Sequence, residues 1–171
     1  MEERTGVVSL QGQPQTLLGP ALKVGDRAPE FEVLDNKLSP IQLASFKGKI
    51  IILASVPSLD TPVCDLETRR FNTEAGKLDP DVRILTISMD LPFAQKRWCG
   101  AAGVDKVVTL SDHRTASFGS AYGVLIKELR LLARAVFVLD RNGVIRYIQV
   151  LPDLAQEPDY DEVIKVVEKL V

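Results

Sequence analysis

A cysteine stands directly after the most apolar run of the chain. The segment PSLDTPVC (57–64) follows IIILASV and holds one of only two cysteines. Thr61 is a favoured N-cap residue and Pro62 is favoured at the first position of a helix, so Cys64 is expected in a first helical turn. Unpaired backbone N–H groups and the positive end of the helix dipole favour a thiolate there. Cys64 is therefore either a nucleophile or a small apolar residue packed beneath a helix cap.

Acidic residues around this helix start disfavour a thiolate, so an activated cysteine needs a nearby cation. The carboxylates concerned are Asp60, Asp65 and Glu67. Arg69 and Arg70 follow on the same helix and are expected to point away from its first turn. Arg134 opens the otherwise apolar run ARAVFVLD, where a charge without a partner is costly. Arg134 is thus either the partner of Cys64 or a solvated strand end.

The second cysteine, Cys99, lies in KRWCGAAG, near the expected end of another helix. A disulfide with Cys64 requires the two Cα atoms to come within about 7 Å of each other. Two cysteines at the ends of different helices meet only if a helix end loosens, which Gly100 and Gly103 would ease. Trp98 should then report the movement. The alternative is that Cys99 is a half-buried apolar helix residue.

The composition excludes several classes of function. The chain has 171 residues and a formal net charge of −2, so no basic field indicates nucleic acid or an anionic membrane. No apolar run approaches the roughly 20 residues that span a bilayer, and the first residues resemble no signal peptide. We therefore expect a cytoplasmic protein, where two cysteines are typical of catalysis or redox sensing. The single histidine, His113, cannot complete a metal site with distant cysteines, so no metal is expected.

Hydrophobic periodicity and turn signals predict strands alternating with helices. The expected elements are a hairpin at 6–19 turning at Gly12–Pro14, strands at 31–35, 41–46 and 49–56, a helix at 62–78, a strand at 82–88, a helix at 92–103, a strand at 106–110, a hairpin at 133–150 turning at Asn142–Gly143, and a helix at 159–170. This order favours an α/β fold in one domain, 1–171, with a mixed central sheet flanked by helices and an N-terminal β-hairpin. Ligands of such sheets bind beyond the carboxyl ends of the parallel strands, where Cys64 falls.

Several segments together resemble a known family. The pattern Pro-x-x-x-Thr-x-x-Cys, formed by Pro57, Thr61 and Cys64, resembles with Arg134 the active site of peroxiredoxins, which have a thioredoxin-like fold. The segments DTPVCDLETRRFN, SDHRTASFGSAYGV, RAVFVLDRNG and EPDYDEV, with the first hairpin, are similar to the thiol peroxidase (Tpx-type) subfamily of atypical two-cysteine peroxiredoxins. This similarity covers nearly the whole chain.

The resemblance implies a role for each of these residues. Cys64 would be the peroxidatic cysteine, which becomes a sulfenic acid, and Cys99 the resolving cysteine, which forms an intramolecular disulfide with it. Thr61 and Arg134 would hold the thiolate and polarise the peroxide, while Pro57 would shield the pocket from water. The implied substrates are hydrogen peroxide and alkyl hydroperoxides. The implied partners are a thioredoxin-like reductant and a second copy of the chain, and no cofactor is needed.

Two other functions fit the same cysteines. A thioredoxin-like thiol–disulfide oxidoreductase would share the fold, but such proteins use a close Cys-x-x-Cys, which this sequence lacks. A peroxide-sensing redox switch would form the same disulfide and react slowly with peroxide. Peroxide turnover distinguishes both from a peroxidase.

Overall fold

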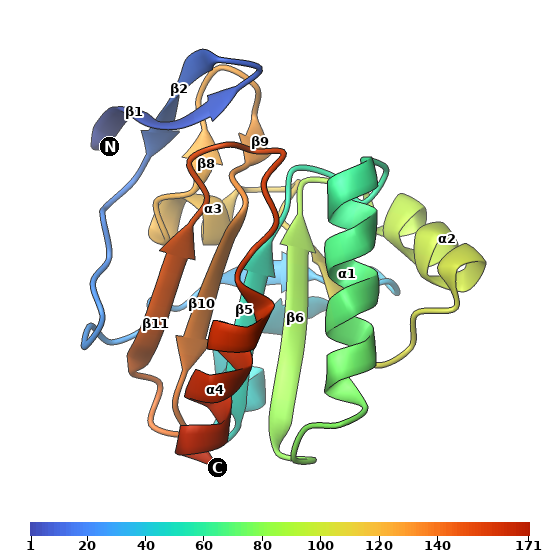
Figure 1. Ribbon diagram of the computed structural model, residues 1–171. Coiled ribbons are helices and arrows are strands. Elements are labelled where there is room, and N and C mark those ends of the chain that lie inside the picture. Colours follow the sequence, from blue (N-terminus) through green and yellow to red (C-terminus); the bar gives the residue numbers. More distant parts are fainter.

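A seven-stranded mixed sheet forms the centre of the computed structural model, which describes residues 1–171 (Figure 1). Its strands, in spatial order, are β11 (Ile145–Val150), β10 (Ala135–Leu139), β5 (Ile50–Ser55), β6 (Val82–Ser88), β7 (Val108–Ser111), β3 (Glu32–Leu34) and β4 (Pro40–Gln42). The pairs β5–β6 and β6–β7 are parallel, and the other pairs are antiparallel. The continuous apolar run predicted as a strand is thus β5, an interior strand between β10 and β6.

Helices and a second sheet cover the two faces of this sheet. Ile50 and Ile52 of β5 share a buried cluster with side chains of α1 (Pro62–Ala75) and α4 (Tyr160–Leu170). Ile51 and Leu53 alternate with them and join a larger cluster on the opposite face, which includes side chains of α3 (Ser117–Ala121). Helix α2 (Pro92–Ala102) lies beside α1 (Figure 1). Burial on both faces explains why β5 shows no alternation of apolar and polar residues.

The N-terminal hairpin belongs to a second, four-stranded sheet. Its strands are β1 (Glu3–Leu10), β2 (Gln13–Leu18), β8 (Leu125–Ile126) and β9 (Leu131–Leu132). The hairpin was expected to turn at Gly12–Pro14, but it turns at Gln11 and Gly12, which both have positive φ angles (50° and 79°). Pro14 instead pairs with Ser9 inside the ladder. The β8–β9 hairpin was missed because strands of two residues show no periodicity.

Three predicted boundaries also need correction. The expected strand 41–46 ends at Gln42, and Leu43–Phe46 form a 3₁₀ helix. Helix α1 ends at Ala75, three residues early, because Gly76 caps it. Strand β7, expected to start at residue 106, starts at Val108. Helix α2 ends as predicted, with Gly103 in the left-handed conformation (φ 68°) that glycine adopts without strain.

The topology brings the ends of several elements to one edge of the central sheet. The carboxyl end of β5 leads into α1, and that of β6 leads into α2. Strand β10 runs the opposite way, so Ala135 at its start pairs with Ser55 at the end of β5. Arg134 therefore lies at the edge from which the chain enters α1. None of the helices is long and apolar enough to cross a membrane.

Candidate active site

Cys64 is the third residue of α1 and is fully buried. It forms a small apolar cluster with Val56 and Leu59, and the half-buried Trp98 packs against this cluster. Pro57, in the same connection between β5 and α1, is buried as well. The thiol of Cys64 is free. Water is thus largely excluded from a sulfur atom at the amino end of a helix, where the dipole stabilises negative charge.

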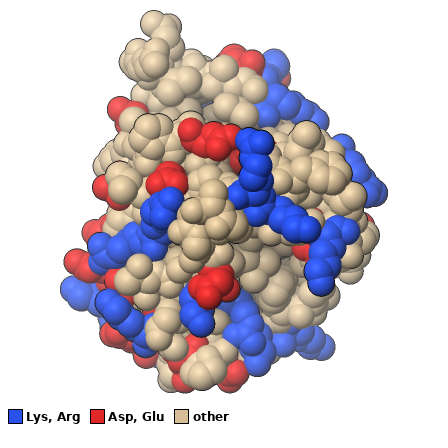
Figure 2. All heavy atoms as spheres, turned by 90° about the vertical axis from the view of Figure 1, so that its right-hand side faces the viewer, with Lys and Arg blue, Asp and Glu red and all other residues tan.

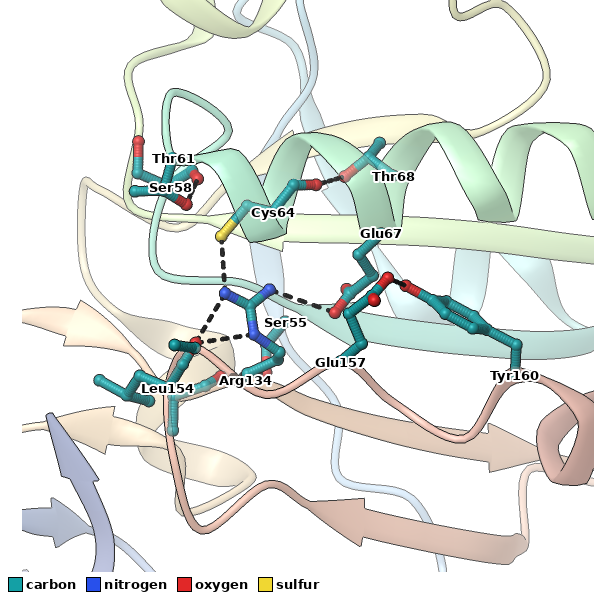
Figure 3. Close-up of polar contacts among 12 residues, drawn as sticks. Ser55, Ser58, Thr61, Cys64, Glu67, Thr68, Arg134, Leu154, Glu157 and Tyr160 are labelled. Carbon is teal, nitrogen blue, oxygen red and sulfur yellow. Dashed lines mark hydrogen bonds and ion pairs between the residues drawn. The ribbon is translucent and has the colours of Figure 1, made fainter. Parts of the chain in front are cut away.

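Arg134 lies against this sulfur (Figure 3). Its Nη2 donates to Cys64 Sγ at 3.1 Å, and its Nη1 donates to Glu67 Oε1 at 3.2 Å. Nε and Nη2 also donate to the carbonyl oxygen of Leu154, at 2.9 and 2.8 Å. The residue is only 1% exposed, so it is not a solvated strand end. Bonds to three acceptors fix the plane of the guanidinium with one edge toward Cys64.

Glu67 shares the guanidinium with the cysteine and is completely buried. Burial raises the pKa of its carboxyl from 4.5 to about 7, although the Arg134 charge lowers it and the nearby Glu157 raises it slightly. Its Oε2 has no hydrogen-bond partner. One guanidinium thus lies between the carboxyl group of Glu67 and the sulfur of Cys64. Sequence reasoning treated Glu67 only as a charge to be neutralised and missed its contact with Arg134.

The charge balance differs from the one expected from the sequence. From the sequence, Arg134 was expected to offset the charges of Asp60, Asp65 and Glu67. In the structure its only carboxylate partner is Glu67. Asp65 is paired with Arg69, Nε to Oδ2 at 2.8 Å, and its Oδ1 accepts the indole N–H of Trp98 at 3.0 Å. The expectation that Arg69 points away from the first turn is therefore wrong. Asp65 and Arg69 are four residues apart, which brings their side chains together on one helix face.

Thr61 takes the N-cap position of α1 with extended backbone angles, but its hydroxyl caps no backbone N–H of the helix. Instead Oγ1 donates to the carbonyl oxygen of Ser58 at 2.9 Å (Figure 3). Ser58 Oγ donates in turn to Asp90 Oδ1 at 2.7 Å, and Asp90 Oδ2 accepts the backbone N–H of Leu59. This turn, bonded to Asp90 just after β6, holds the Thr61 hydroxyl on the carbonyl oxygen of Ser58. Nothing local in the sequence indicated that Asp90 holds it.

Thr61→Val tests the role in peroxide attack that the resemblance to peroxiredoxins implies for this hydroxyl. We expect attack to slow by roughly 10-fold or more, because valine keeps the side-chain shape and removes the hydroxyl that would turn from Ser58 to the peroxide. Thr61→Ser keeps the hydroxyl and should retain most activity. Stability should change by less than the roughly 1 kcal/mol of a lost cap, since the hydroxyl makes no cap bond. Stopped-flow measurement of the bimolecular phase tests this. Equal rates for Thr61→Val and the parent would make the hydroxyl purely structural.

Cys99 occupies the last turn of α2, where it is half buried. Its Sγ contacts Thr109 Oγ1 at 3.4 Å, on β7, whereas the sulfur of Cys64 contacts Arg134. Both thiols are free, and Trp98, next to Cys99, packs on the cluster around Cys64. An open cavity of about 400 Å³ at the start of α1 is lined by Leu59, Thr61 and Trp98, among others. Neither this cavity nor a larger one, of about 690 Å³, is lined by a cysteine.

The fold and this site define the chain as a thioredoxin-like thiol protein, because a buried thiol lies in the first turn of the helix that follows the parallel strand β5, and a buried arginine bonds to it. The chain belongs to the Redoxin family, whose family model matches residues 23–164. It is similar to the thiol peroxidases of Bacillus subtilis, at 56% identity over 96% of this chain and 98% of the relative, and of Oceanobacillus iheyensis, at 56% over 95% and 98%. The crystal structure of a peroxiredoxin-like protein from Aquifex aeolicus superposes with a TM-score of 0.91, at 43% identity, over the whole of both chains.

Proposed function

We propose that this thiol peroxidase reduces hydrogen peroxide and alkyl hydroperoxides with Cys64 as the nucleophile. The contact of Arg134 Nη2 with Cys64 Sγ, at 3.1 Å in a buried pocket, carries the proposal. The thiolate attacks the terminal oxygen, the O–O bond breaks, and its electron pair leaves with the second oxygen. That oxygen takes up a proton and departs as water or alcohol, and Cys64 becomes a sulfenic acid.

Positioned donors, more than ionisation of the thiol, must supply the rate. Lowering a thiol's pKa from ~8.5 to ~6 raises its thiolate fraction at pH 7 about 30-fold. The accompanying loss of nucleophilicity cancels roughly 10-fold of this gain. The remaining acceleration requires hydrogen-bond donors aimed at the charge that develops on the peroxide. We assign this role to the Arg134 guanidinium, to the backbone N–H groups of the first turn of α1, and to the Thr61 hydroxyl once it turns from the carbonyl oxygen of Ser58. The bond of Arg134 to Cys64 supports the assignment.

In the second step the Cys99 thiol attacks the sulfur of the Cys64 sulfenic acid, releases water and forms an intramolecular disulfide. A thioredoxin-like dithiol in a reducing cytoplasm restores both thiols. This reductant would approach from the face that carries α2, on which Figure 2 shows many Lys and Arg side chains. Lys96 and Arg97 of α2 are both exposed. We further propose that the protein is a homodimer. We also propose that residues 1–171 act as one domain, because one buried cluster joins both sheets.

Cys99→Ser is the variant that tests this sequence of steps. It should still consume one equivalent of peroxide, because attack precedes resolution, and then stop at the sulfenic acid and over-oxidise in excess peroxide. The parent should form a Cys64–Cys99 disulfide within one chain and turn over with a thioredoxin system. Peptide mapping by mass spectrometry follows each species. A disulfide between two chains, or a free Cys99 in the oxidised parent, would contradict the proposal.

A further inference from the structure

One face of α1 holds the half of α2 that carries Cys99. Asp65, Arg69 and Asn72 are spaced four and three residues apart, so they lie on one stripe of α1. We call these three residues the α1 stripe. Helices α1 and α2 lie next to each other in Figure 1, and all three side chains of the stripe bond to α2 or to the segment after it.

Each member of the stripe makes a different bond. Asp65 Oδ1 accepts the indole N–H of Trp98 at 3.0 Å. Arg69 Nη1 donates to the carbonyl oxygen of Ala102 at 3.1 Å, and its guanidinium lies 5.8 Å from the centre of the Trp98 ring. This bond satisfies one of the carbonyl groups that a helix leaves unpaired at its carboxyl end. The stripe therefore holds the end of α2 through the side chain of Trp98 and through the backbone carbonyl of Ala102.

Asn72 secures the segment that follows α2. Its Oδ1 accepts the backbone N–H groups of Asp105, Lys106 and Val107, at 3.2, 2.6 and 3.3 Å. One side-chain oxygen thus fixes the turn between the end of α2 and the start of β7. Because this turn begins only three residues after the end of α2, the bonds to Asn72 limit how far the last turn of α2 can move.

The first half of α2 is anchored separately. Gln95 is fully buried, and its Nε2 donates to the carbonyl oxygen of Leu110 at 2.8 Å and to Ser88 Oγ at 3.0 Å. These bonds attach the start of α2 to β6 and β7 and involve no residue of α1. The last turn, with Cys99, can therefore unwind while the first half stays in place, provided that the bonds to the α1 stripe break.

We infer that the α1 stripe sets the rate at which Cys99 reaches the oxidised Cys64, with Asp65, Arg69 and Asn72 acting as positioning residues for the second step of the proposed peroxidase cycle. Cys99 must leave Thr109, and the last turn of α2 must unwind, before the disulfide forms. Weaker bonds to the stripe increase the fraction of molecules in which the last turn of α2 is unwound. The rate of disulfide formation then rises by the same factor. The stripe thereby also sets how long the sulfenic acid is exposed to a second peroxide.

Asn72→Ala and Asn72→Asp form the matched test, because Asn72 contacts neither cysteine. Losing the shared acceptor should speed the unimolecular phase of Trp98 fluorescence that follows oxidation by about 2- to 10-fold. Asn72→Asp keeps an acceptor oxygen and should resemble the parent. The bimolecular attack phase should be the same in all three proteins. Hydrogen exchange should rise in the last turn of α2 of Asn72→Ala and stay unchanged around Gln95.

Arg69→Gln and Arg70→Gln give an independent comparison, since Arg70 bonds to Glu74 and Asp161 and makes none of the contacts with α2. Arg69→Gln should speed the unimolecular phase and raise the peroxide concentration that over-oxidises half of the enzyme, and Arg70→Gln should change neither. Unchanged or slower disulfide formation in Asn72→Ala and Arg69→Gln overturns the inference while leaving the peroxidase itself intact. Absence of any Cys64–Cys99 disulfide in the parent would instead refute the proposed function.

Discussion

Cys64→Ser is expected to abolish peroxide reduction and leave the fold intact. A serine hydroxyl is essentially un-ionised at neutral pH, so no nucleophile comparable to a thiolate remains. The fold should survive because serine is similar in size and its Oγ can accept the bond that Arg134 Nη2 now donates to Sγ. We expect a loss of stability of about 1 kcal/mol from replacing a buried sulfur by a hydroxyl that keeps a partner.

Peroxide consumption with a thioredoxin system measures the loss, and thermal unfolding verifies the fold. Cys99→Ser is the matched control, since it also removes one thiol but should retain a single turnover. A Cys64→Ser protein that still reduces peroxide at a substantial fraction of the parent rate would refute Cys64 as the nucleophile. In that case Cys99, the other thiol in the chain, would have to be tested as the reacting group.

The parts of the fold that local signals specify could be predicted from the sequence. An unbroken apolar run predicted the buried strand β5, Pro62 predicted the start of α1, and the Asn142–Gly143 turn predicted the β10–β11 hairpin. The contact between Arg134 and Cys64 was predicted as one of two alternatives, because an arginine in an apolar run needs a partner. The antiparallel pairing of β10 with β5, which the sequence does not specify, brings Arg134 to the edge of the sheet where α1 begins.

What the sequence did not predict depends on contacts between distant segments. The Leu154 carbonyl orients the Arg134 guanidinium, and a backbone carbonyl leaves no signal in the sequence. Leu154 is itself placed by the first hairpin, since its N–H donates to the carbonyl oxygen of Ser9. The pairing of Asp65 with Arg69 is a different case, because spacing by four residues on a helix was sufficient to predict it.

Arg134→Gln should slow attack on peroxide by roughly 100-fold, comparable to the removal of one donor from an oxyanion hole. The variant loses the charge beside Cys64 and the donor that bonds to its sulfur. Arg134→Lys should recover only part of the rate, because an ammonium group cannot bond to Cys64, Glu67 and Leu154 at once. Stopped-flow kinetics of peroxide attack measure this loss in each variant.

A second substitution distinguishes lost chemistry from lost stability in Arg134→Gln. Without Arg134 the buried Glu67 has no cation, and breaking a buried ion pair costs about 3–5 kcal/mol. The pKa of Glu67 in the folded parent is about 7, above its ordinary 4.5, so its contribution to stability is complete below 4.5 and is lost as the pH rises through 7. Arg134→Gln should raise this pKa further and therefore unfold more easily as the pH increases.

The double variant Arg134→Gln/Glu67→Gln removes the ionisable group, and it should recover stability and lose this pH dependence without regaining the rate of attack. Recovery of the rate together with stability would mean that Arg134 acts only as a structural residue.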